Sequence, residues 1–227
     1  MKRRWAMMKW ILVLVCSLGL WACKSSGPVT QVSGAFDGAG KVLVLPFQDM
    51  AWLHGTNVNV RSPLTGKVFM TGATREGADR LLTDLLVDAL QQQTALQTVP
   101  SRDAYAVMNA VKSAGDSQQS ALKILAKTGR MLKADMVIQG YLYRFEDRVG
   151  ADYSAESAAS VAFDVYLIDC VEQKLVWSGY FDQTQQALSD DLRYIGTFFR
   201  RGGRWITAEE MATTAMDDMF KEFKQPR

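Results

Sequence analysis

Residues 157–184 read SAASVAFDVYLIDCVEQKLVWSGYFDQT, and they contain two long stretches with the alternation of a β-strand. One stretch spans residues 157–170 and the other residues 174–184. Apolar or small residues at alternate positions fall on one face of each: Ala159, Val161, Phe163, Val165 and Leu167, then Leu175, Trp177, Gly179 and Phe181. A third apolar stretch, residues 134–147, precedes them. Because the segments between the three are short, we predict an antiparallel meander.

The amino-terminal half predicts a strand–helix–strand unit. The run KVLVLPF, residues 41–47, is continuously apolar up to Pro46, which is typical of a buried central strand. Apolar residues recur every three or four positions across residues 74–93, and this spacing predicts an amphipathic helix. A short strand is expected at residues 96–99.

Two further helices are expected before the meander. Ser101 is suited to be the N-cap of the first, with Asp103 in its first turn, and Gly115 ends it. The second spans residues 117–128 and is followed by Gly129, which we expect at the C′ position.

The last helix carries a complete set of start signals. Thr207 is the expected N-cap, Glu210 is its capping-box partner, and Ile206 is placed to pack on Met211 as a hydrophobic staple. Further along, one face of the helix is apolar: Ala212, Ala215, Met216, Met219, Phe220 and Phe223. At this spacing we interpret the stripe as core.

These elements predict an α/β (α+β) domain at residues 41–227 with a single mixed sheet. The order is βαβααβ, followed by the antiparallel strand meander and a C-terminal helix packed on the sheet. Insertions at residues 48–73 and 186–204 interrupt this order. We expect the first insertion to be irregular, with a short hairpin that pairs residues 58–60 with residues 67–70.

The two insertions are the candidate partner-contact surfaces. The core elements are explained without them, and long loops in compact domains are usually functional or disordered. The candidate contact residues within them are Trp52, His54, Arg200, Arg201 and Arg204.

The amino terminus has the features of a lipoprotein export signal. Basic residues precede an apolar run that is too short for a membrane span of roughly 20 residues, and the run ends in LWAC. We therefore expect cleavage between Ala22 and Cys23 and a lipid on Cys23. Residues 1–22 are then the signal peptide. Residues 23–40, rich in Gly, Ser and Thr, form a lipidated flexible tether with neither strand nor helix periodicity.

Loss of the signal peptide changes the charge balance. The chain has 26 basic and 24 acidic residues, and removal of Lys2, Arg3, Arg4 and Lys9 leaves 22 basic ones, a formal charge of −2. This balance argues against a nucleic-acid partner. Cys170 is the one cysteine that stays unlipidated in the mature chain. Since one thiol cannot form an internal disulfide, stability has to come from the core.

The residue inventory argues against catalysis. His54 is the only histidine, and the chain has no G-x-S-x-G nucleophile elbow. Ser120 and Lys123 fit S-x-x-K, but the companion motifs of that acyl-transferase pairing are missing. One histidine and one unlipidated cysteine are too few for the usual nitrogen and sulfur metal sites. We expect no catalytic site, no metal and no cofactor.

Several of these motifs together resemble a known group of envelope lipoproteins. The motifs are VLVLPF at residues 42–47, LKADMVIQG at residues 132–140, VYLID at residues 165–169 and LVW at residues 175–177. The group shares the amino-terminal domain of TolB and includes CsgG, LpoB and lipoproteins auxiliary to ABC transporters. The resemblance covers most of residues 41–185. It implies the same fold and an address in the cell envelope.

The function expected from these features is binding. Lys24 follows the lipidated cysteine in place of the aspartate that in this lipoprotein class signals retention at the inner membrane. We expect an outer-membrane lipoprotein, facing the periplasm, that acts as a non-catalytic binding or assembly module. Its expected partners are the membrane, through the lipid, and envelope proteins, and a homo-oligomer is compatible. Two alternatives stay open: a small-ligand binding lipoprotein serving a transporter, and an envelope hydrolase using Ser120 or His54.

Overall fold

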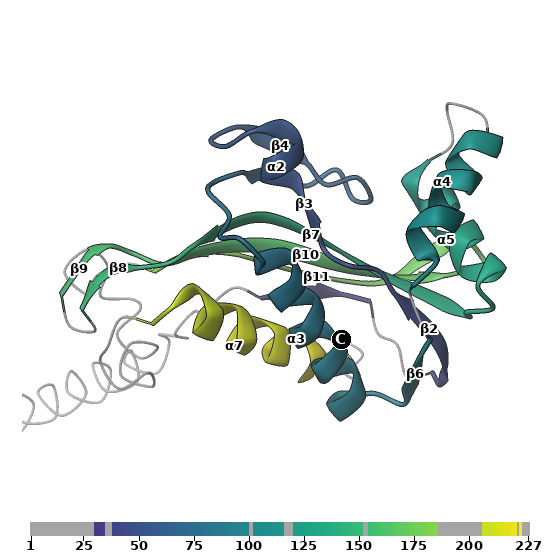
Figure 1. The fold of residues 1–227 in the computed structure, drawn as a ribbon. Helices are drawn as coiled ribbons and strands as arrows, with labels where there is room; N and C mark the ends of the chain where they lie inside the picture. The colour runs from purple at the N-terminus through teal and green to yellow at the C-terminus, as the bar shows by residue number, and fades with distance from the viewer. Residues whose placement is uncertain are drawn as a thin grey trace, which may run out of the picture.

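The computed structural model describes residues 30–34, 38–99, 102–115, 120–151, 154–185, 206–221 and 223. One mixed sheet carries helices on both faces, and two short hairpins form separate two-stranded sheets (Figure 1). The predicted α/β class with a single mixed sheet is confirmed.

The main sheet has seven strands within the described residues, six of them in the order β1-β11-β10-β7-β2-β6. Their bounds are β1 Gln31–Ser33, β2 Gly40–Val44, β3 Gln48–Asp49, β6 Leu96–Val99, β7 Met136–Glu146, β10 Ser160–Asp169 and β11 Lys174–Thr184. β2 lies between β6 and β7 and runs parallel to both, and β3 adds a short parallel pairing to β7. The expected central position of the first predicted strand is confirmed.

The antiparallel meander is also confirmed, as β7, β10 and β11. A bulge changes its register near the hairpin: Leu167 pairs with Trp177, whereas the next residue, Ile168, pairs with Leu175. The prediction that Leu175 shares a face with Trp177 is wrong for this reason. Leu175 packs with the clusters on the opposite face of the sheet, and Val176 packs with the cluster of Trp177.

One face of the sheet is covered by α3 (Ala78–Gln93) and α7 (Ala208–Lys221), which lie side by side (Figure 1). The predicted apolar stripe of α7 lies entirely in this core. α3 begins four residues later than predicted, because Gly77 precedes it with φ of 76°. The residues before Gly77 run along β7 instead, where the Phe145 N–H donates to the Ala73 carbonyl and the Arg75 N–H donates to the Phe145 carbonyl.

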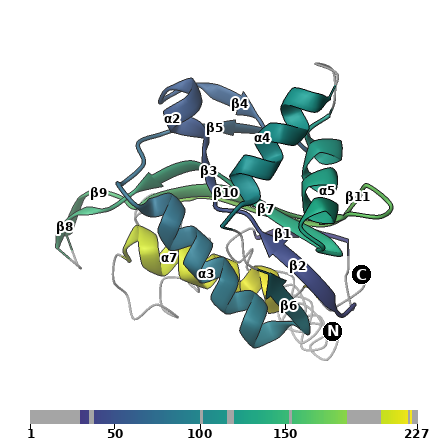
Figure 2. The same cartoon turned by 45° about the vertical axis from the view of Figure 1, so that its right-hand side comes forward.

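The opposite face carries α4 (Ala104–Ala114) and α5 (Ala121–Met131) at one end (Figure 2). α4 follows Asp103 and ends at Gly115 as expected, and the predicted cap Ser101 lies outside the described residues. α5 begins after Ser120 and continues through Gly129, so the predicted end at Gly129 is wrong. Glycine is needed there for close packing, because a Cβ would overlap the Cys170 sulfur and the Val137 side chain.

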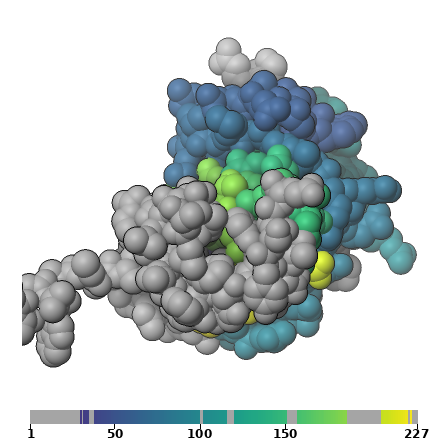
Figure 3. Space-filling model, turned by 90° about the vertical axis from the view of Figure 1, so that its left-hand side faces the viewer, coloured from purple at the N-terminus to yellow at the C-terminus, as the bar shows by residue number. Residues whose placement is uncertain are grey.

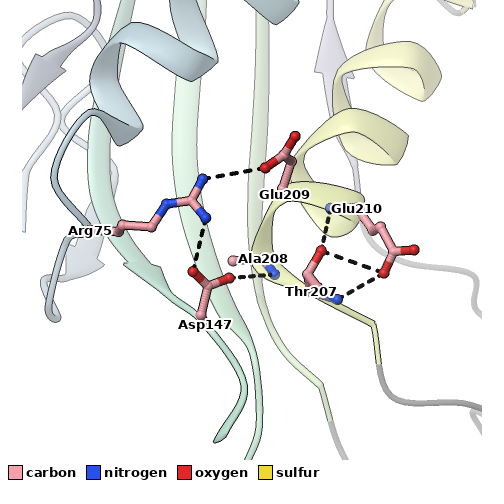
Figure 4. Close-up of polar contacts among 6 residues, drawn as sticks. All are labelled: Arg75, Asp147, Thr207, Ala208, Glu209 and Glu210. Carbon is pink, nitrogen blue, oxygen red and sulfur yellow. Dashed lines mark hydrogen bonds and ion pairs between the residues drawn. The ribbon is translucent and has the colours of Figure 1, made fainter. Parts of the chain in front are cut away.

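The start of α7 is fixed by the predicted capping box and by three further polar contacts (Figure 4). The Thr207 hydroxyl accepts from the Glu210 N–H at 3.1 Å, and the Glu210 carboxylate accepts from the Thr207 N–H at 2.9 Å. Asp147, just after β7, accepts from the Ala208 N–H at 3.2 Å. Arg75 pairs with Asp147 at 3.1 Å and with Glu209, on α7, at 3.4 Å.

The structure contains one strand in the predicted tether and one hairpin that was not predicted. β1 pairs antiparallel with β11 inside the predicted tether, residues 23–40, so the expectation of no strand there is wrong. β8 (Val149–Ala151) and β9 (Ser154–Ser157) form a hairpin between the first two strands of the meander. Each is too short to show a periodicity in the sequence. The predicted signal peptide, Cys23 and the insertion at residues 186–204 lie outside the described residues.

Candidate functional site

The insertion at residues 48–73 forms a layer of its own on the sheet face that also carries α4 and α5 (Figure 2). It begins with β3 and a short helix, α2 (Met50–His54), so its expected irregular structure is wrong at this end. The Asp49 carboxylate caps α2 by accepting from the Trp52 N–H at 2.9 Å. Its other oxygen accepts from the Thr74 hydroxyl at 2.6 Å, which fixes both ends of the insertion to each other.

The predicted hairpin is confirmed as β4 (Asn59–Arg61) and β5 (Val68–Met70). Val60 and Phe69 are buried toward the sheet, while their neighbours on both strands are exposed. The Phe69 ring stacks on the ring of Tyr143, on β7, with centroids 4.1 Å apart. The hairpin is therefore held on the sheet by a small core of its own, distinct from the cores under the long helices.

A buried carboxyl group lies beneath the hairpin. Asp164, on β10, is 0% exposed, and one of its oxygens accepts from the hydroxyls of Tyr143 at 3.0 Å and Tyr166 at 2.6 Å. The Tyr166 oxygen is in turn 2.7 Å from the Ser62 hydroxyl and 2.8 Å from the Thr65 hydroxyl. Since Tyr166 gives its only hydrogen to Asp164, both hairpin hydroxyls donate to Tyr166.

This carboxyl group has an unusual electrostatic environment. Burial raises the pKa of Asp164 from 3.8 to about 7, although the hydrogen bonds from Tyr166 and Tyr143, together with the charge of Lys67, act in the opposite direction. Its second oxygen has no hydrogen-bond partner among the residues that the structure describes. Burial and the nearby carboxylate also raise the pKa of Tyr143 and of Tyr166. At neutral pH the group is thus close to the midpoint of its titration.

The insertion exposes large apolar side chains to solvent, next to polar ones such as Asn59 and Arg61 on the hairpin. Trp52, on α2, is 82% exposed, and it heads a set of exposed residues that we call the insertion surface: Trp52, Leu53, Val58, Val68 and Met70. The space-filling view in Figure 3 shows this part of the chain, in blue, as a layer that stands out from the green strands of the sheet. The five residues lie on α2, on the segment before β4 and on β5. Large apolar side chains that are exposed in one insertion are a candidate interaction site.

The structure places some of the predicted site residues and leaves others outside its description. Trp52 and His54 both lie on α2 and are exposed. Arg200, Arg201 and Arg204 lie outside the described residues, as do Ala22 and Cys23. The insertion surface therefore consists of Trp52 and of four apolar residues that were not singled out from the sequence: Leu53, Val58, Val68 and Met70.

The residues considered for hydrolysis lie on separate elements. His54 ends α2, whereas Ser120 is the N-cap of α5 and accepts from the backbone N–H of Lys123 at 3.4 Å. The S-x-x-K spacing is thus explained by helix capping. In the described ranges, no group of three or more His, Cys, Asp or Glu could hold a metal ion, and no helix is long and apolar enough to cross a membrane.

The buried cluster around Asp164 was missed from the sequence. The available signal was a charged residue inside the apolar run VAFDVYLI of β10, on the face opposite the long-helix core. Its hydrogen-bond partners in the hairpin lie about 100 residues earlier in the chain. No local pattern links positions so far apart.

Comparison with protein-family models and with curated proteins finds no match to this sequence. The fold is similar to that of solved structures. A PelC dodecamer from Paraburkholderia phytofirmans matches with a TM-score of 0.50 and 12% identity, over 88% of this chain and 100% of that chain. The LpoB C-terminal domain from Escherichia coli matches with a TM-score of 0.39 and 12% identity, over 67% of this chain and 88% of that chain. The lipoprotein GNA1162 from Neisseria meningitidis matches with a TM-score of 0.37 and 12% identity, over 72% of this chain and 97% of that chain. The PelC match shows that this chain shares its fold.

Proposed function

We propose that this protein is a lipid-anchored lipoprotein of the outer membrane that faces the periplasm and acts as a non-catalytic binding or assembly module. The observation that carries the proposal is the insertion surface, because exposed apolar side chains are displayed there on a segment that is fixed to the sheet. A surface that is apolar and held in place loses little conformational entropy when a partner binds. The partner is an envelope protein or a second copy of this chain, as in the PelC dodecamer.

The lipid supplies proximity in this proposal. Cleavage after Ala22 leaves Cys23 as the acylated first residue, and eight chain steps separate it from Gln31, where β1 begins. An extended chain covers at most about 3.5 Å per residue, so the edge of the sheet stays within about 28 Å of the anchor. Confinement of this kind raises the effective concentration of the domain for partners at the same membrane.

The positions of the candidate nucleophile, Ser120, and the candidate base, His54, support a non-catalytic role. Ser120 serves as a helix cap, and His54 lies exposed on a different element. The titrating carboxyl of Asp164 is covered by the hairpin and bonded to two tyrosines, so it faces no substrate. The membrane and envelope proteins are the proposed partners, and no cofactor is needed.

Site-specific photo-crosslinking in cells tests the role of the insertion surface. A photoreactive residue replaces Met70, and a matched control replaces Arg80, which is exposed on α3 across the sheet. We expect Met70 to crosslink to an envelope protein or to a second copy, and Trp52→Asp to abolish that product. Equal products from the Arg80 position, or a Met70 product that Trp52→Asp leaves unchanged, would contradict the proposal.

Metabolic labelling tests the anchor separately. Cys23→Ala should abolish the incorporation of labelled palmitate and leave an uncleaved precursor, because the acylated sulfur is the signal for cleavage in this lipoprotein class. Continued labelling of the Cys23→Ala protein would refute the assignment of the lipidated residue.

A further inference from the structure

A cleft of about 320 Å³ lies between α4–α5 and the insertion. Gln139 and Tyr141 line it from the sheet, Met108 from α4, Ile124 from α5 and Pro63 from the turn of the hairpin. Its volume is at the lower end of the range of about 300–1,000 Å³ that is typical of small-ligand sites. None of the described residues that line the cleft belongs to the insertion surface.

Two buried polar groups in the cleft have bonding capacity left. Tyr141 is 3% exposed, and its hydroxyl makes no hydrogen bond with any residue that the structure describes. Gln139 is 5% exposed, and its Nε2 donates to the carbonyls of Pro46 at 3.2 Å and Gly140 at 2.7 Å. These two bonds fix the amide orientation and leave Oε1 as an acceptor without a donor among the described residues. The buried part of the lining therefore offers a ligand one hydroxyl and one amide oxygen, and the exposed side chains of Tyr105 and Gln48 lie at the same cleft.

The remaining lining defines the charge and polarity of a ligand. Met108, Ile124 and Leu125 provide apolar walls. Among the described residues that line the cleft, Lys112 alone carries a charge. Asp164 lies behind Tyr141, where its charge helps to raise the pKa of that tyrosine, so Lys112 is the group that favours an anion here. The complementary ligand thus has an apolar body and one negative charge.

We propose that this cleft binds a peptide carboxyl terminus that ends in an apolar residue. The apolar side chain lies between Met108 and Ile124, the last amide N–H donates to Gln139 Oε1, and the carboxylate meets Lys112 and the Tyr141 hydroxyl. At about 30 Å³ for each group of the size of a water molecule, the cleft holds about ten groups, which is one apolar residue with its amide and carboxylate. A simple fatty acid fits less well, because it brings no donor for Gln139.

A set of three small probes separates the parts of this recognition. N-acetyl-leucine has the side chain, the amide and the carboxylate; N-acetyl-leucinamide lacks the charge, and 4-methylpentanoate lacks the amide. Each is titrated against the full-length protein in detergent by ligand-observed NMR, with protein-free detergent as the blank. We expect N-acetyl-leucine to bind at least tenfold more tightly than either analogue. Equal affinities, or no measurable binding of N-acetyl-leucine, would overturn the proposal.

Charge reversal gives the matched test in the protein. Lys112→Glu should weaken N-acetyl-leucine binding at least tenfold and leave N-acetyl-leucinamide binding unchanged. Lys123→Glu, at an exposed position of α5 outside the cleft lining, should change neither. An unchanged affinity of the Lys112→Glu protein for N-acetyl-leucine would refute the proposed site. Trp52→Asp should not affect this binding, so failure at the cleft and failure at the insertion surface are distinguishable.

Discussion

Asp164→Asn should remove a pH dependence of stability that the buried carboxyl group imposes on the folded protein. The folded state holds the Asp164 proton because burial disfavours the charged form, and the pKa rises from 3.8 to about 7. In the unfolded chain the same carboxyl is solvated and ionises near 3.8. Asparagine keeps an acceptor for the two tyrosine hydroxyls but cannot ionise.

The sign and size of the effect follow from linkage. Below pH 3.8 Asp164 is protonated in both states, and the full stability is present. Between pH 3.8 and about 7 the unfolded chain gives up the proton while the folded state keeps it, so the free energy of unfolding falls as the pH rises. Above about pH 7 the loss is complete. A difference of about three pKa units corresponds to a loss on the order of 4 kcal/mol.

Urea unfolding from pH 4 to pH 8 measures this difference directly. In Asp164→Asn the amide nitrogen takes the place of the second Asp164 oxygen, which has no partner among the described residues. The unpaired amide should lower the free energy of unfolding by about 1–3 kcal/mol at every pH. The free energy of unfolding of Asp164→Asn minus that of the wild type should therefore rise by about 4 kcal/mol between pH 4 and pH 8. The variant is expected to be less stable than the wild type at pH 4 and more stable at pH 8. Asp217→Asn, at a partly exposed position of α7, should show no such rise. A constant difference for Asp164→Asn would refute the reasoning.

Two further substitutions test the packing of the sheet and the start of α7. Gly140→Ala places a Cβ against the buried Phe47 ring and should destabilise the protein by about 1–3 kcal/mol in urea unfolding. Phe47→Leu in the same chain should recover part of this loss, and strict additivity of the two changes would contradict the contact. Thr207→Ala removes the acceptor of the Glu210 N–H and should cost about 1 kcal/mol, whereas Thr213→Ala, in the middle of the same helix, should stay within about 0.5 kcal/mol. Equal costs at the two threonines would argue against the cap.

The elements that could be predicted from the sequence are those specified by local rules over many residues. β10 and β11 show the period of a strand over ten or more residues, and α7 begins with a capping box and continues as one apolar stripe. The errors arise where tertiary contacts override such rules. Gly129 is a suitable helix end in isolation, but here it is the small residue that allows α5 to approach Val137 and Cys170.

The candidate site was harder to predict than the fold. The first insertion could be located as a long segment between two elements, and its hairpin could be placed, since both are local features. α2 could not, because five residues are too few to show a period. The cleft depends on how α4, α5 and the hairpin lie over β7, and only the three-dimensional structure provides that arrangement.

The position of Asp164 connects the two features of the insertion that bear on function. An apolar residue would cost less at this site in the core, since a buried carboxyl with one unpaired oxygen is unfavourable once it ionises. The carboxyl group sets the direction of the hydrogen bonds around it. It accepts the Tyr166 hydrogen, so the Tyr166 oxygen is left to accept from Ser62 and Thr65 in the hairpin. Apolar packing alone is less selective about how the hairpin sits on the sheet, whereas these hydrogen bonds require one arrangement. The same arrangement sets where Val68 and Met70 face the solvent, so the group that titrates near neutral pH also positions the surface proposed for partner binding.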